Sequence, residues 1–80
     1  LEEIKASMQF WPNPTEDRVF MESTVEVQSI QVRTLQGHLM YEQTINGRLT
    51  SLSTKNWPPG MYVVSVATRF GWTQHKLIKS

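Results

Sequence analysis

Residues that favour turns recur at short intervals along this 80-residue chain, and their spacing limits the folds open to it. They form five groups: Pro12-Asn13-Pro14, Gly37, Asn46-Gly47, Pro58-Pro59-Gly60 and Gly71. Between them, no segment keeps an apolar period of 3.6 residues over three turns, so we expect essentially no α-helix. Short β-rich runs separated by such turns are typical of an antiparallel sandwich or barrel.

Seven runs between these turns are predicted strands. The clearest is residues 4–10, where every second residue from Ile4 to Phe10 is apolar and the residues between are polar. The other six cover residues 19–21, 27–35, 39–43, 49–53, 61–67 and 72–78. Asn46-Gly47 predicts a two-residue hairpin turn, because both residues tolerate a positive φ. We therefore predict an all-β fold of about seven short antiparallel strands in two sheets.

Length and charge narrow the class of protein. Eighty residues make one domain, 1–80, and the 8 basic and 7 acidic residues leave no dense basic patch for nucleic acid. No apolar run approaches the roughly 18 residues that would span a bilayer. The absence of cysteine removes disulfides and thiolate chemistry. Because the sequence begins at Leu1 rather than Met, we interpret it as a fragment of a longer protein.

The residues that carry catalysis do not form a recognisable constellation. His38 and His75 are 37 positions apart, without clustered carboxylates, and no two acidic residues form an obvious glycosidase pair. Neither a nucleophile elbow nor a phosphate-binding glycine loop is present. We therefore expect no enzymatic activity, no cofactor and no metal site.

The segment from Pro58 to Val66 is the strongest signal in the chain. Its prolines end the preceding run, and Gly60 permits a tight backbone immediately before a strand. Alternation places Tyr62, Val64 and Val66 on one inward face. A tyrosine in this place can bond its hydroxyl back to the backbone of the corner, as in immunoglobulin-like sandwiches. Read on its own, the motif is a corner followed by a core strand.

Two weaker motifs lie near the ends of the chain. In Trp11-Pro12-Asn13-Pro14-Thr15 the two prolines lack a backbone donor, so the segment is expected to cross between strands outside any ladder. In Lys76-Leu77-Ile78-Lys79-Ser80, alternation puts Leu77 and Lys79 on one face and Lys76 and Ile78 on the other. Basic residues at the end of a last strand commonly serve solubility and protection of the sheet edge.

The three tryptophans have two interpretations. Trp11, Trp57 and Trp72 can line a carbohydrate or peptide groove, or they can belong to the core of so small a domain. We favour a core position for Trp57, just before the proline corner, and expect Trp72 to be the most exposed.

The order and spacing of these motifs resemble the C-terminal sorting domain of the type IX secretion system, also called the Por secretion system, of Bacteroidetes-type bacteria. The resemblance runs from about Phe10 to Ser80 and begins with the Pro-Asn-Pro-Thr block. It continues with the run from Ile30 to Gly37, where Arg33 and Thr34 replace the family's usual Tyr and Asp. It then includes the Gly60, Tyr62 and Val66 block, and ends in Lys76-Leu77-Ile78-Lys79.

The resemblance implies a fold and a function. It implies an immunoglobulin-like β-sandwich at the C-terminus of a secreted protein, whose N-terminal cargo reaches the periplasm by its own signal. The domain would then engage the outer-membrane translocon and often be removed by a sortase-like signal peptidase at the cell surface. The expected location is therefore the periplasm in transit, then the cell surface or the medium.

The resemblance also suggests which residues form the sorting motif. They are Pro12, Asn13, Pro14, Gly60, Tyr62, Val66, Lys76, Leu77, Ile78 and Lys79. The last strand is expected to present unpaired backbone groups together with Lys76 and Lys79, for a partner that adds a strand or carries acidic groups. Such an edge can also support strand exchange, so the isolated domain can form a strand-swapped homodimer. The alternative function is an immunoglobulin- or fibronectin-like accessory module that binds carbohydrate or spaces domains.

Overall fold

The computed structural model describes residues 7–80, and every element in that range is a β-strand. The five strands are β1 (Met8–Trp11), β2 (Arg18–Thr34), β3 (Leu39–Ser53), β4 (Gly60–Thr68) and β5 (Gly71–Lys79). All four strand pairings are antiparallel, and they join the strands into one sheet with the order β1-β2-β4-β5, with β3 on the other side of β2. The prediction of an all-β antiparallel fold is confirmed.

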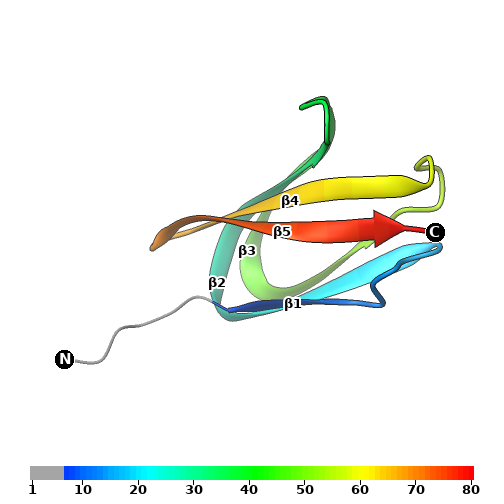
Figure 1. Ribbon diagram of the computed structural model, residues 1–80. Helices are drawn as coiled ribbons and strands as arrows, with labels where there is room; N and C mark the ends of the chain where they lie inside the picture. The colour runs from blue at the N-terminus through cyan, green and yellow to red at the C-terminus, as the bar shows by residue number, and fades with distance from the viewer. Residues whose placement is uncertain (1–6) are drawn as a thin grey trace.

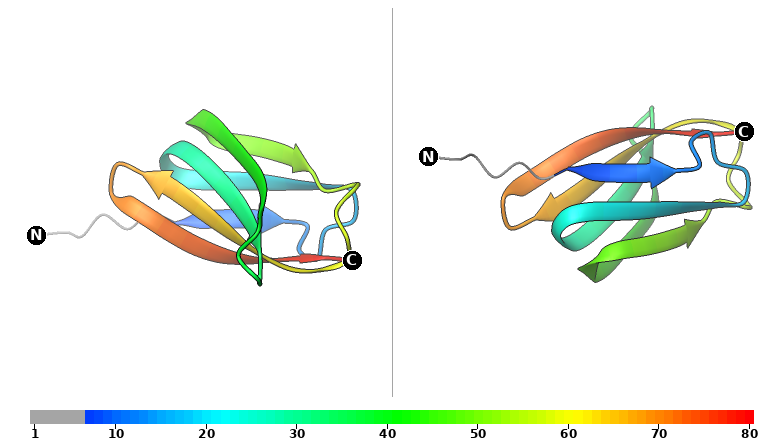
Figure 2. Two further views of the ribbon diagram at one scale, coloured as in Figure 1. Left: turned by 90° about the horizontal axis from the view of Figure 1, so that it is seen from above. Right: turned by 90° about the horizontal axis from the view of Figure 1, so that it is seen from below.

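The sheet curls into a half-barrel around its apolar side (Figures 1 and 2). β2 is long enough to pair with β1 near its start and with β4 over its second half, while β3 follows it along both halves. The curl brings β1 and β5, at the two ends of the strand order, next to each other. There the rings of Phe10 and His75 lie 5.2 Å apart between centroids, and the Thr73 hydroxyl approaches the Met8 sulfur at 3.5 Å.

The prediction of about seven strands is wrong, because two pairs of predicted strands are continuous. Residues 19–21 and 27–35 both belong to β2, which bends near Ser23, where its hydroxyl bonds the Val25 amide and carbonyl. Gln28 is then an extra residue relative to β4, and this bulge moves the inward side chains from odd positions to even ones. One bent strand therefore takes the place of two predicted strands. The strands form a single curled sheet rather than two separate sheets.

The predicted hairpin at Asn46-Gly47 is also wrong, and only one of its two residues has the expected positive φ. Asn46 does adopt a positive φ of 55°, but β3 continues through it from Leu39 to Ser53. Between Thr44 and Leu49 the register against β2 shifts, so Asn46 forms a bulge at which β3 bends with β2. The predicted turns at Gly37 and Gly71 are present, with φ values of 93° and 113°.

The core is mainly aliphatic and lies inside the curl. From β4, which is paired on both sides, come Tyr62, Val64 and Val66, all almost completely buried as predicted. The remaining buried apolar side chains of the core cluster are Val19, Met21, Val27, Ile30, Val32, Leu52 and Leu77. In the described part of the first predicted strand, Met8 and Phe10 face this core as expected, whereas residues 4–6 of that prediction lie outside the described range.

Substitutions at Asn46 test whether β3 forms a bulge there. Replacing Asn46 by Val should lower the free energy of unfolding by about 1–2 kcal/mol, because a β-branched residue is poorly tolerated at positive φ. Asn46→Gly should cost nothing measurable, since no Cβ opposes that conformation. Urea denaturation of the three proteins measures both effects. A midpoint for Asn46→Val equal to that of the parent chain would contradict the assigned conformation.

Candidate functional site

Three of the four motif blocks meet at one end of the half-barrel. Gly60, which begins β4, is the register partner of Lys79, near the end of β5. Thr15, from the loop between β1 and β2, forms a parallel bridge with that same Lys79. The end of β5 therefore lies between the start of β4 and the β1–β2 loop, and the C-terminus can be seen beside this loop in Figure 1. We call this region the C-terminal end of the sheet.

Asn13 uses its side chain as a strand would use its backbone. Its Nδ2 donates to the Lys76 carbonyl at 3.2 Å, and its Oδ1 accepts from the Ile78 amide at 3.0 Å. A carboxamide carries the same donor and acceptor as a peptide group, so one side chain satisfies two neighbouring backbone groups on the β5 edge. The prolines on either side have no amide hydrogen, and both peptide bonds that precede them are cis.

Thr15 continues this pairing with its own backbone. Its amide donates to the Ile78 carbonyl at 2.8 Å, and its carbonyl accepts from the Ser80 amide at 2.9 Å. Its buried hydroxyl donates to the Arg18 carbonyl at 2.9 Å and lies 3.1 Å from the buried hydroxyl of Thr54. The β1–β2 loop is thus bonded both to β5 and to the loop that follows β3.

Lys79 is buried rather than presented to a partner, which corrects the expectation from its place at the chain end. Only 9% of the residue is exposed, and its ammonium group donates to the backbone carbonyl of Glu16. The predicted alternation itself is confirmed: Leu77 is buried on the same face, while Lys76 and Ile78 lie on the exposed face. Lys76 is therefore the exposed basic side chain of this motif.

The outer edge of β5 also differs from the expectation that its backbone groups are unpaired. Asn13 and Thr15 together satisfy the Lys76 and Ile78 carbonyls and the Ile78 and Ser80 amides. A partner cannot add a strand to this half of β5 while the β1–β2 loop stays in place. The sequence reasoning missed this because a Pro-Asn-Pro-Thr segment has no strand pattern, even though it occupies the position of a neighbouring strand.

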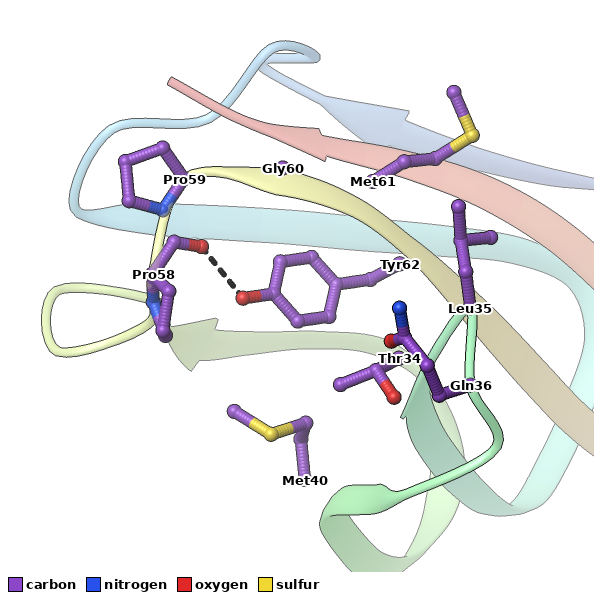
Figure 3. A pocket seen from close by; sticks show the side chains of 9 residues that line it. All are labelled: Thr34, Leu35, Gln36, Met40, Pro58, Pro59, Gly60, Met61 and Tyr62. Carbon is purple, nitrogen blue, oxygen red and sulfur yellow. Dashed lines mark hydrogen bonds between the residues drawn. The ribbon is translucent and has the colours of Figure 1, made fainter.

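The corner before β4 has the predicted arrangement. The Tyr62 hydroxyl donates to the Pro58 carbonyl at 2.5 Å, as Figure 3 shows, and only 4% of the residue is exposed. The half-buried Trp57 ring packs against the Tyr62 ring at a centroid distance of 5.1 Å, which confirms its place beside the core. Trp72, with 57% exposed, is the most exposed tryptophan, also as predicted.

The residues of the predicted sorting motif thus divide into two groups. Tyr62, Val66, Leu77 and Lys79 are buried and support the fold. Pro12, Asn13, Pro14, Gly60, Lys76 and Ile78 are exposed. Except for Val66, all of them lie at or next to the C-terminal end of the sheet, so its surface is the part of the motif that another protein can contact.

The titratable groups give little support to catalysis. Within residues 7–80, no three side chains of His, Cys, Asp or Glu come together in a way that holds a metal ion. Desolvation by burial lowers the pKa of His75, whose Nε2 lies 2.9 Å from the Thr73 hydroxyl, and this favours its neutral form. The absence of metal binding and of catalysis remains a prediction.

Comparison with known proteins assigns the chain to a family. A model of the secretion system C-terminal sorting domain matches residues 9–80. The chain belongs to this family. The match covers every motif of the C-terminal end, from Pro12 to Lys79, and the family acts as a sorting signal in type IX secretion. No curated protein matches the chain. The described residues form no helix long and apolar enough to cross a membrane.

The tyrosine corner of this sorting domain can be tested by two substitutions. Tyr62→Phe should lower the free energy of unfolding by about 1 kcal/mol, because it removes the bond to the Pro58 carbonyl and keeps the ring. Tyr62→Ala should lower it by about 3–5 kcal/mol, since it also leaves a cavity beside Trp57. Thermal and urea denaturation measure both. An unchanged melt for Tyr62→Ala would mean that the ring is not part of the core.

Proposed function

We propose that this domain directs an N-terminal cargo through the outer-membrane translocon of the type IX system, and that the translocon recognises the folded C-terminal end of the sheet. The observation that carries the proposal is the convergence of the sorting motifs. The Pro-Asn-Pro-Thr loop is at least 45 residues away in sequence from both Gly60 and the end of β5, yet Thr15 and Gly60 both contact Lys79. A linear signal would need no such arrangement.

The chemistry of this end fits recognition by shape together with charge. Lys76 and Ile78 point outward from β5, next to Asn13 and the two prolines. The prolines and the bonded Asn13 fix the backbone here, so little conformational entropy is lost when a partner binds. An exposed lysine beside an apolar side chain suits a partner surface that carries both acidic and apolar groups.

The rest of the proposed route follows from the family. The cargo would first cross the periplasm. A sortase-like signal peptidase at the cell surface would then separate it from the domain, and the cargo would stay on the cell surface or enter the medium. Family membership favours this function over the accessory-module alternative. A strand-swapped homodimer remains a proposal for the isolated domain, and it requires the β1–β2 loop to release β5 first.

A reporter fusion tests the function. Residues 1–80 are joined to the C-terminus of a reporter that carries a periplasmic signal, and the fusion is expressed in a type IX-competent bacterium. We expect the reporter at the cell surface or in the medium, and we expect Lys76→Glu to reduce export at least about fivefold. Exposed charge changes normally alter stability by no more than about 0.5 kcal/mol, so Lys76→Glu should still fold.

The matched control is Arg69→Glu, which reverses an exposed charge in the β4–β5 hairpin at the opposite end of the sheet. It should export like the parent fusion. Lys79→Glu is not a useful probe, because Lys79 is buried and its replacement would unfold the end of the sheet. Periplasmic retention of the intact fusion, in a strain whose own cargo is exported, would contradict the proposed function. Equal export of both charge variants would mean that Lys76 is not recognised.

A further inference from the structure

We propose that the free edge of β3, over residues 39–45, binds an extended segment of a partner protein, and that this segment places an apolar side chain in the cleft beside the edge. The inference goes beyond the sorting function and does not depend on which machinery recognises the C-terminal end. It rests on three features: unpaired backbone, an adjacent apolar cleft and the charge pattern of β3.

β3 has a strand neighbour on one side only. Within residues 7–80 it pairs with β2 and with no other strand, whereas the loop residues Asn13 and Thr15 cover the end of β5. The Thr34 amide donates to the His38 carbonyl at 2.9 Å, which sets the direction of the bonds between β2 and β3. By alternation along β2, Val32 and Ile30 also direct their backbone groups toward β3, where their register partners are Tyr41 and Gln43. The backbone groups of Glu42 and Thr44 therefore face the free edge, because Met40 is an extra residue of β3 that shifts the alternation counted from His38.

A cleft of about 300 Å³ lies between the β2–β3 turn and the corner before β4, and Met40 near the start of β3 lines it. Figure 3 shows the side chains of Leu35, Met40 and Met61 around the buried Tyr62 ring, with Pro58 and Pro59 on the far wall. No charged residue lines it. Leu35 is 62% exposed, and the two methionines are flexible, so the cleft can adapt to an apolar side chain. An edge next to an apolar pocket is the combination used in binding by strand addition.

The charges on β3 indicate what kind of segment fits. Glu42 is the one charged residue between Leu39 and Ile45; its exposed carboxylate accepts one hydrogen bond, from the Gln31 side chain on β2, and keeps its negative charge for a partner on the other side. If two copies paired antiparallel over this whole segment, Glu42 would lie opposite Glu42 of the other copy, and like charges directly opposite destabilise a sheet. A different chain with a lysine or arginine opposite Glu42 avoids that repulsion. The partner segment is therefore extended, apolar at alternate positions, and basic near its middle.

Titration of the isotope-labelled 80-residue chain with a synthetic peptide tests the proposal. The probe is a ten-residue peptide of alternating valine and threonine with one central lysine, and the comparison peptide has glutamate in place of that lysine. NMR should show shifts at residues 39–45 and in the lining of the cleft. The lysine peptide should bind at least about fivefold more tightly, because it faces Glu42 with the opposite charge.

Two pairs of variants separate the edge from the cleft. Thr44→Pro removes an amide hydrogen that faces solvent, which an edge strand tolerates, and it should abolish binding. Thr44→Val keeps that amide and should bind like the parent chain. Met40→Ser should weaken binding about fivefold by making the cleft polar, whereas Met40→Leu should not. Spectra of residues in β4 and β5 check that each variant is folded.

Three results would overturn the proposal. One is the absence of shifts with either peptide at millimolar concentration. Another is binding that survives in folded Thr44→Pro, which would assign the contact to the cleft alone. The third is concentration-dependent self-association through β3 without peptide, which would make a second copy the occupant. If Thr44→Pro does not fold, the Met40 pair and the two peptides still decide the outcome.

Discussion

The bonds between the Asn13 side chain and the β5 backbone are the interaction on which the C-terminal end of this domain depends. β5 is the last strand of the sheet order, so its outer backbone groups have no strand to pair with. Leaving buried donors and acceptors unpaired costs about 1–3 kcal/mol each, and leaving an exposed edge unpaired invites association with other chains. A carboxamide held between two prolines satisfies the Lys76 carbonyl and the Ile78 amide without a further strand.

Several other features follow from this arrangement. With the loop fixed on β5, the Thr15 backbone can bond Ile78 and Ser80, and the Glu16 carbonyl comes within reach of the Lys79 ammonium group. A buried ammonium ion needs such acceptors, because its transfer from water is costly. The Thr15 and Thr54 hydroxyls then connect the same loop to the chain that follows β3. Parts of the sequence that are far apart thus form one surface, which a partner can recognise only in the folded domain.

The sequence predicted those features that depend on local chemistry. The inward face of β4, the Tyr62 bond to its corner, the exposure of Trp72 and the alternation of Leu77 and Ile78 all follow from patterns within a few residues. The strand count did not follow, because the bulge at Asn46 resembles a turn in sequence while the ladder continues through it, and because the mostly polar residues 22–26, left between two predicted strands, belong to β2 itself. The burial of Lys79 and the position of Asn13 did not follow either, because both depend on contacts 63 to 65 residues away.

Hydrogen exchange at the Ile78 amide measures whether the Asn13 side chain holds the end of β5. By alternation, the Gln74 amide faces the same edge of β5 farther from Asn13, and it serves as an internal reference. Ile78 should exchange much more slowly than Gln74 in the parent chain. In Asn13→Ala its exchange should accelerate at least about tenfold, whereas Asn13→Asp, which keeps the acceptor, should retain most of the protection. Exchange at Ile78 as fast as at Gln74 in the parent chain would show that Asn13 does not hold the end of β5.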